Sequence, residues 1–228
     1  HIGSIGTHLS IELAQHAQNT GVNAISSLPP FYYNFSNDQI FDFYNDIASS
    51  TDLPLIVYNI DNAGLMGFNM LQKLSSIKNV IGVKYTATTH FDIMRIKKEI
   101  GKHFIVYCGS DEMAISGILS GADGLIGSFY NLMPEIFLLI IKALKNNDIQ
   151  TAKNLQEKAN TVIFFSLAHK SYFSIIKRGM EWQGINAGYC RKPLNDYEIQ
   201  ESENQLIREF KELKKNNDLS GINFLDFI

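Results

Sequence analysis

The feature that most constrains the fold of this chain is an alternation of short β-branched segments with longer helical ones. The strand-like segments begin at Asn23, Pro54, Val80, Phe104 and Asp123, so neighbouring starts are about 20 to 30 residues apart, the length of one strand and one helix. Such alternation is typical of parallel sheets, because a crossover helix returns the chain to the start of the next strand. The sequence therefore predicts an α/β fold built from βα units.

The segments between the strands have helical periodicity and recognisable ends. In "SNDQIFDFYNDIA", Ser36 and Gln39 have the spacing of a capping box. The segment "THFDIMRIKKEIG" stops at Gly101, and glycine is common just after a helix C-terminus. In "MPEIFLLIIKALK", Pro134 stands in the first turn, where proline is tolerated. We expect a helix in each of these segments.

The two ends of the pattern set the expected division of the chain. After about Asn147 only helical patterns remain, so we expect βα units over residues 1–146 and a helical extension over residues 147–228. At the other end, "HIGSIG" has the character of a strand end, which makes six βα units. Six parallel strands do not close a barrel, whereas eight do. The spacing leaves open an open sheet or a barrel whose first two units precede His1.

Composition disfavours several classes of function. Twenty basic and 23 acidic side chains give a net charge of −3, and no basic block is long enough to follow a nucleic acid backbone. The longest apolar run, "IFLLII", is far shorter than the roughly 20 residues that span a bilayer, so we expect no membrane span. Two cysteines are too few for a disulfide framework and favour a reducing, cytoplasmic location. The six histidines are scattered and no glycine-rich loop has nucleotide-binding spacing, so we expect neither a metal nor a cofactor.

One charged residue ends an otherwise apolar strand. In "NVIGVKYT", Gly82, Lys84 and Thr86 share one face because side chains alternate along a strand, while Val83 and Tyr85 take the other. A lysine after an apolar run has usually reached water. In parallel α/β folds, however, the C-terminal ends of strands also hold the active site.

Other polar residues are predicted at the same ends of the strands. Tyr58 ends "PLIVY", Asp111 and Glu112 follow "VYCG", and Ser128 follows "LIG". Each alone has a structural explanation, as a core tyrosine, as acids in a first helical turn, or as a helix cap. Together they indicate a site in which a neutral lysine is a candidate nucleophile toward a carbonyl, forming a Schiff base, and a phenol one strand away is a candidate proton relay.

Six motifs carry a family resemblance over nearly the whole chain: "PPFYYNFS", "LIVYNI", "GVKYT", "GSDE", "GADGLIGSFYN" and "AGYCRKP". In this order they resemble the pyruvate-dependent aldolase family of dihydrodipicolinate synthase and N-acetylneuraminate lyase, and within it the lyases. The resemblance implies a (β/α)8 barrel with a C-terminal helical extension, a homotetramer, and a chain that begins at the third strand. It also implies cleavage of N-acetylneuraminate, a sialic acid, to N-acetylmannosamine and pyruvate through a lysine Schiff base.

Position by position, the resemblance implies roles for individual residues. Lys84 forms the Schiff base with the pyruvate ketone, and Tyr58 relays protons and contacts the pyruvoyl carboxylate. Tyr32 matches a tyrosine that the family passes to the site of a neighbouring subunit. The residues that would hold the sugar portion, with the two carboxylates accepting hydrogen bonds from its hydroxyls, are Thr86, Gly109, Asp111, Glu112 and Ser128.

The chain departs from the family pattern after Tyr58. The family's "YNIP" is "YNID" here, so Asp61 replaces a proline with a fixed φ, and the following segment is about two residues short. We expect an altered fit of the substrate. We also expect the family's carboxylate-binding turn, with two further βα units, ahead of His1. A chain restricted to residues 1–228 should then be poorly soluble and inactive, because its sheet edges would be unpaired.

Two alternatives remain open. One is another member of the family, such as a dihydrodipicolinate synthase or a keto-deoxy sugar acid aldolase. The synthases usually carry an arginine where this chain has Ala63, and "GSDE" resembles the sugar lyases. The other is a catalytically silent relative that binds sialic acid or pyruvate. A binding protein needs no nucleophile, so the presence of both Tyr58 and Lys84 disfavours it, although Asp61 keeps it open.

Overall fold

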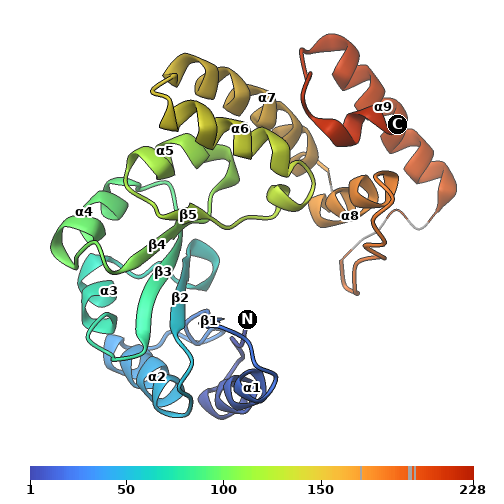
Figure 1. Cartoon of the computed structure of the whole chain (residues 1–228). Coiled ribbons are helices and arrows are strands. Elements are labelled where there is room, and N and C mark those ends of the chain that lie inside the picture. Colours follow the sequence, from blue (N-terminus) through green and yellow to red (C-terminus); the bar gives the residue numbers. More distant parts are fainter. Residues whose placement is uncertain (170, 195–196, 198) are drawn as a thin grey trace. The chain divides into compact units, whose positions relative to one another are not determined.

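Five parallel strands form one sheet, in which each strand pairs with the next strand along the chain (Figure 1). All five coincide with the predicted strand segments. A consecutive parallel order is the connectivity of βα units in which every crossover returns the chain to the adjacent position. The strands are β1 (Ile25–Ser27), β2 (Leu55–Ile60), β3 (Val80–Thr86), β4 (Ile105–Cys108) and β5 (Gly124–Leu125).

The computed structural model describes residues 1–169, 171–194, 197 and 199–228. The chain divides into two compact units: residues 1–110 with 116–126, and residues 111–115 with 127–228. The first unit contains the sheet, and the second is helical. The expected division of the chain at residue 146 stays a prediction.

The sixth expected strand, at residues 1–6, does not form. One backbone hydrogen bond, from Ile2 N to Ser26 O at 2.8 Å, joins this segment to β1. A strand requires a repeated ladder of such bonds, and Gly3 and Gly6 weaken the preference for one. The beginning of the chain therefore lies along the edge of β1 without extending the sheet.

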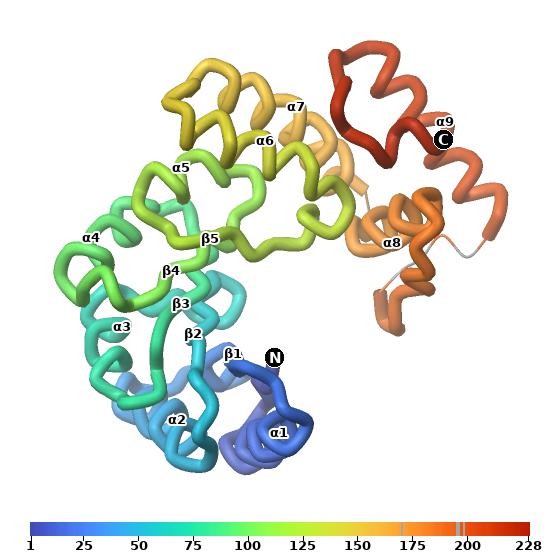
Figure 2. The backbone as a smooth tube through the Cα atoms, in the orientation of Figure 1, coloured from blue at the N-terminus to red at the C-terminus, as the bar shows by residue number. Residues whose placement is uncertain are grey.

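The helices of the first unit begin and end where the sequence signals predict. Ser36 caps α2 in a full capping box with Gln39, and Gly101, with φ of +126°, follows the end of α4. Successive helices α1 to α4 lie beside one another in chain order (Figure 2). The helices are α1 (Thr7–Asn19), α2 (Asn37–Ser49), α3 (Phe68–Leu74), α4 (Phe91–Glu99) and α5 (Ala114–Leu119), whose first two residues belong to the second unit.

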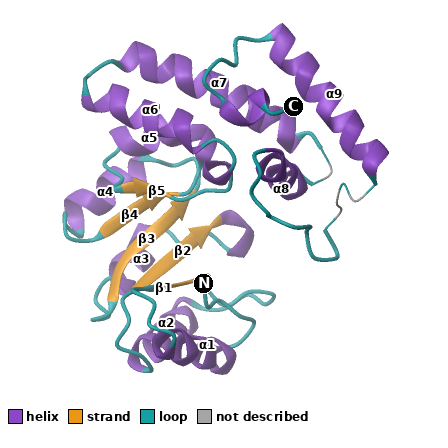
Figure 3. Ribbon diagram, turned by 45° about the vertical axis from the view of Figure 1, so that its right-hand side comes forward, coloured by secondary structure: helices purple, strands orange, loops and turns teal. Residues whose placement is uncertain are grey.

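Alternation along the strands gives the sheet two different faces. Val57, Val83 and Val106 pair across β2, β3 and β4, and all three are fully buried in the core of the first unit. Tyr85 points the same way and donates a hydrogen bond to Asp92 of α4, at 2.8 Å. The expected division of β3 is thus confirmed: Val83 and Tyr85 pack under helices, which leaves the opposite face for polar residues. Figure 3 shows the strands of the sheet together with the helices that follow them.

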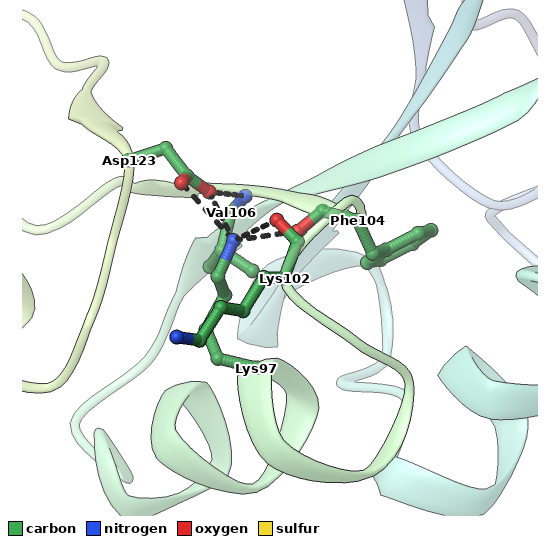
Figure 4. Close-up of polar contacts among 5 residues, drawn as sticks. All are labelled: Lys97, Lys102, Phe104, Val106 and Asp123. Carbon is green, nitrogen blue, oxygen red and sulfur yellow. Dashed lines mark hydrogen bonds and ion pairs between the residues drawn. The ribbon is translucent and has the colours of Figure 1, made fainter.

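A lysine ties together the segments at the start of β4 and β5. The Lys97 ammonium of α4 donates to the carbonyls of Lys102 and Phe104 and to both carboxylate oxygens of Asp123, at 2.8 to 3.0 Å (Figure 4). Asp123 also accepts a bond from Val106 N at 2.7 Å. Because these contacts lie where the strands begin, they support the sheet at the end opposite the expected site.

The second unit is built from helices around an aromatic core. Phe210 contacts Phe165, Trp182 and Phe224, with ring centroids 4.7 to 6.0 Å apart. In the described ranges no strand follows Asn147, as predicted, and no helix is long and apolar enough to cross a membrane. Within the expected helical extension, Lys170, Asn195, Asp196 and Glu198 lie outside the described residues. The helices are α6 (Pro134–Lys145), α7 (Ile149–Leu167), α8 (Tyr172–Trp182) and α9 (Gln200–Asn216).

Three-residue 3₁₀ turns join several of these elements. Those that bear on the candidate site are Asp61–Ala63 after β2, Asp111–Met113 after β4 and Phe129–Asn131 after β5.

Candidate active site

Lys84 lies in a row of three residues that crosses the middle of the sheet. In the register of the strands, Tyr58 of β2 pairs with Lys84 of β3, and Lys84 pairs with Tyr107 of β4. Paired residues on neighbouring strands project from the same face, and the strands lie about 5 Å apart. A phenol therefore flanks the lysine on each side.

These three side chains line a pocket of about 450 Å³ in the first unit. Its remaining walls come from β1, the neighbouring part of β2 and the residue after β5, and they are mostly apolar. A pocket with apolar walls and a few convergent polar groups is typical of small-molecule sites. The other lining residues are His1, Ala24, Ile25, Ser26, Ile56 and Ile126.

The Lys84 amine has an aromatic partner and no acidic one. Its Nζ lies 3.9 Å from the centroid of the Tyr58 ring. Within the described part of the chain, no hydrogen bond or ion pair to this amine is recorded, and the side chain is half-buried. Among the residues that the structure describes, no carboxylate therefore holds the amine away from a substrate carbonyl.

Glycines on the same face make room for the lysine and its neighbours. A Cβ at position 109 would collide with the Thr86 hydroxyl and would lie 3.1 Å from Lys84 Cε. A Cβ at position 124 would lie 3.1 Å from the Tyr107 ring. The ring of Tyr107 and the stem of Lys84 thus occupy space that any larger residue would fill.

Thr86 brings a hydroxyl to the same region. Its Oγ1 is buried and, among the described residues, has no hydrogen-bond partner. A buried hydroxyl without a partner costs free energy, so such a group is a candidate for a bond to a ligand. The structure therefore brings Tyr58, Lys84, Thr86 and Gly109 together, while the roles expected for them stay predictions.

The turn after Tyr58 is held by a side-chain amide. Asn59 is fully buried; its Nδ2 donates to Met66 O at 2.9 Å and its Oδ1 accepts from Met66 N at 2.8 Å. Asp61 begins the 3₁₀ turn that Gly64 N closes on Asp61 O, at 3.0 Å. The restraint that a proline would give at position 61 is therefore supplied by hydrogen bonds at both ends of the loop.

On the helix-facing side of β3, Tyr85 is unsuited to proton transfer near neutral pH. Burial raises its pKa to about 12, and its hydroxyl is engaged with Thr89 and Asp92. Tyr85 therefore takes no part in the pocket, which Tyr58 and Tyr107 line on either side of Lys84.

The remaining residues expected to hold the sugar belong to the second unit. Asp111 is buried, and its Oδ2 accepts a hydrogen bond from Phe129 N at 2.8 Å. A Cβ at position 127 would collide with the Asp111 carboxylate, so glycine is required there. Glu112 is half-buried, and the described residues include no hydrogen-bond partner for its carboxylate. Ser128 precedes the Phe129–Asn131 turn without capping it through its side chain.

Tyr32 lies on an exposed loop. Its side chain is 85% exposed, its φ is +88°, and its ring packs edge-on against Tyr33 at 4.9 Å. A positive φ is uncommon for tyrosine and costs conformational energy. The expected contact of Tyr32 with a neighbouring subunit stays a prediction.

Three polar residues of the pocket, His1, Ser26 and Tyr107, were missed by the sequence reasoning. His1 Nδ1 lies 3.1 Å from Ser26 Oγ, and its ring meets the Tyr58 ring edge-on at 6.0 Å. Tyr107 was detectable by the alternation that singled out Lys84, because it follows the buried Val106. No sequence signal identified His1 and Ser26. In the described ranges no cluster of three or more His, Cys, Asp or Glu side chains is arranged to hold a metal ion.

Comparisons with known proteins agree with this geometry. The N-acetylneuraminate lyase of Rhizobium meliloti is 36% identical over 211 residues, which are 92% of this chain and 69% of that protein. The N-acetylneuraminate lyase of Clostridium perfringens is 33% identical over 218 residues, 94% of this chain and 73% of that protein.

Solved structures show the same fold. CdNal from Clostridium difficile, in complex with mannosamine, superimposes with a TM-score of 0.85 at 31% identity, over 94% of this chain and 72% of that one. The catalytic lysine mutant of the sialic acid aldolase of Ruminococcus gnavus has a TM-score of 0.85 at 29% identity, over 95% of this chain and 73% of that one.

The consecutive parallel strand order and these structural matches show the fold of the (β/α)8-barrel aldolases. The sequence model of the Dihydrodipicolinate synthetase family matches residues 1–212, which include the whole sheet and every predicted site residue. On this evidence the chain belongs to the dihydrodipicolinate synthetase family.

Proposed function

We propose that this protein is a carbon–carbon lyase that cleaves N-acetylneuraminate to N-acetylmannosamine and pyruvate through a Schiff base on Lys84. The observation that carries the proposal is the Lys84 amine, which lies in the pocket over the Tyr58 ring without an acidic partner in the described ranges. Relatives at 33 and 36% identity are N-acetylneuraminate lyases, and the similar aldolase of Ruminococcus gnavus has a catalytic lysine.

The first half of the reaction forms the covalent intermediate. The neutral Lys84 Nζ attacks the C2 ketone of the open-chain sugar acid, and the resulting carbinolamine loses water to give a protonated imine. The apolar walls of the pocket, such as Ile25 and Ile56, favour this loss of water by limiting solvent near C2. The imine withdraws electrons from C3, which prepares the next bond for cleavage.

The second half breaks the bond between C3 and C4. The C4 hydroxyl loses its proton, C4 becomes the aldehyde carbon of N-acetylmannosamine, and the bonding electron pair passes into an enamine of pyruvate. Tyr58 relays the proton from the C4 hydroxyl to C3 of the enamine. Water then hydrolyses the imine, which releases pyruvate and restores the Lys84 amine.

The other residues of the proposal act on binding. Thr86 offers its hydroxyl to the sugar portion, and Gly109 leaves the space for that hydroxyl and for the lysine stem. Asp111, Glu112 and Ser128 are proposed to contact the sugar hydroxyls, by resemblance to the family. The homotetramer, the contribution of Tyr32 to a neighbouring site and the cytoplasmic location also stay predictions.

Trapping the intermediate tests the proposal directly. Incubation with pyruvate and borohydride should add a reduced pyruvyl group to the peptide that contains Lys84, detected by mass spectrometry. The variant Lys84→Arg should show neither labelling nor turnover, because a guanidinium stays protonated. The exposed Lys78, just before β3, supplies the matched control: Lys78→Arg should label and turn over like the wild type.

Turnover separates this proposal from its alternatives. The wild-type, full-length gene product should release pyruvate from N-acetylneuraminate. Labelling at Lys84 without release of pyruvate would favour another pyruvate-dependent aldolase of the family. Labelling at a different lysine, or at none, would contradict the assignment of Lys84.

A further inference from the structure

Two amide side chains of α7 hold the turn that carries Asp111 and Glu112. The Nε2 of Gln156 donates to Asp111 O at 3.1 Å, and its Oε1 accepts from Ile115 N at 3.2 Å. The Nδ2 of Asn160 donates to Glu112 O at 3.1 Å. Gln156 also donates to Asn160 Oδ1 at 3.0 Å, so the two amides form one connected network within the second unit.

The network engages the backbone of the two acidic residues in succession. The turn Asp111–Met113 is a single short 3₁₀ turn, so it leaves backbone groups without partners in a helical ladder. An amide has both donors and an acceptor, and Gln156, which is buried, therefore pairs at once with a carbonyl of the turn and with the N–H of Ile115 at the start of α5. The peptide groups that follow Asp111 and Glu112 are therefore each held in one orientation by a side-chain amide.

Fixing these peptide groups matters most for Glu112. The Asp111 carboxylate already has a bond to Phe129 N, whereas none of the described residues holds the Glu112 carboxylate. The direction of a side chain follows from its backbone, and a binding group must be supported by neighbours that fix it. For Glu112 that support comes through its carbonyl, from Asn160.

We infer that Gln156 and Asn160 are positioning residues that set the affinity for the sugar product by orienting the Asp111–Glu112 turn. This inference rests on the proposed function and deepens it. It assigns a specificity role to a helix of the second unit, and it separates that role from the chemistry of Lys84. Recognition of the sugar should change with the network while the capture of pyruvate does not.

The condensation of N-acetylmannosamine with pyruvate tests this separation, because the two substrates have separate KM values. Gln156→Glu keeps the acceptor for Ile115 N and loses the donors to Asp111 O and Asn160. We expect it to raise the KM for N-acetylmannosamine about tenfold, the effect of one misplaced hydrogen bond. The KM for pyruvate and the borohydride labelling of Lys84 should stay unchanged.

The same helix offers a matched control. Gln150 and Asn154 form an equivalent amide pair, with Nε2 to Oδ1 at 2.9 Å, but both are exposed and the pair does not contact the turn. Gln150→Glu should therefore leave both KM values as in the wild type. Asn160→Asp loses the donor to Glu112 O and should raise the KM for N-acetylmannosamine but not the KM for pyruvate. This variant provides the test if Gln156→Glu does not fold.

Three results would overturn the inference. Equal increases in both KM values would show that the two amides only stabilise the second unit. A lower melting temperature with unchanged KM values would show the same. An unchanged KM for the sugar in both variants would show that the network does not orient the turn. If the full-length wild-type gene product neither cleaves N-acetylneuraminate nor condenses the two products, the proposed function itself is wrong, which is an outcome distinct from these three.

Discussion

Replacing Lys97 by methionine should destabilise the protein without changing its chemistry. Methionine keeps the length and apolar character of the side chain and removes the ammonium, which has four acceptors at 2.8 to 3.0 Å. The Lys97 side chain is only 15% exposed, whereas that of Asp123 is 41% exposed. The expected loss of folding free energy therefore lies between that for breaking a surface ion pair and that for breaking a buried one.

The structure sets the size of the effect. A surface pair contributes less than about 1 kcal/mol, and loss of one partner of a buried pair costs roughly 3 to 5 kcal/mol. Asp123 keeps its bond from Val106 N and can be hydrated, but the carbonyls of Lys102 and Phe104 lose a charged donor. We expect about 2 to 3 kcal/mol of lost stability, which for a protein of this size lowers the melting temperature by roughly 4 to 12 °C.

Urea and thermal unfolding, followed by circular dichroism, measure this loss. The control is Lys98→Met, which removes a neighbouring exposed lysine from the same helix and should change stability by less than about 0.5 kcal/mol. Turnover per folded molecule of Lys97→Met should equal that of the wild type. The reasoning is refuted if Lys97→Met is as stable as Lys98→Met, or if both variants lose stability equally.

Two further predictions concern the pocket. Tyr58→Phe keeps the ring beside Lys84 and removes the hydroxyl, so turnover should fall about 10²- to 10⁴-fold with the fold intact, and unchanged turnover would show that the phenol has no part in proton transfer. Gly109→Ala places a methyl group against Thr86 and the stem of Lys84, so turnover should fall by about 10²-fold, because small displacements of reacting groups are costly. Gly67→Ala, where a Cβ meets no atom within 4 Å, is its control, and equal activity of the two variants would show that the lysine tolerates displacement.

Much of the fold followed from local signals. The five strands were predictable because β-branched runs recur at the spacing of βα units, and α2 and α4 because Ser36 and Gly101 mark their ends. The strand expected at residues 1–6 was wrong, because pairing with a neighbour, not residue preference, decides whether an edge segment becomes a strand.

The site was predictable only in part. Alternation placed Lys84 and Thr86 on one face, and the same alternation applied to β4 would have added Tyr107. The bonds of Gln156 to the Asp111 turn join residues 45 positions apart, and no local pattern indicates such a pairing. Likewise, only coordinates show that Gly109 is required by the space that Thr86 and Lys84 occupy.

The two hydrogen bonds between Asn59 and Met66 have a consequence for how this barrel can change during evolution or in the laboratory. They close the loop of residues 60–65 on itself, immediately beyond Tyr58, so the loop is anchored independently of its own sequence. Insertions and substitutions between the two anchors, such as aspartate in place of proline at position 61, can then accumulate without moving the Tyr58 phenol. The loop beyond Tyr58 can therefore be exchanged, and new contacts introduced in it, while Tyr58 and Lys84 keep their places in the sheet.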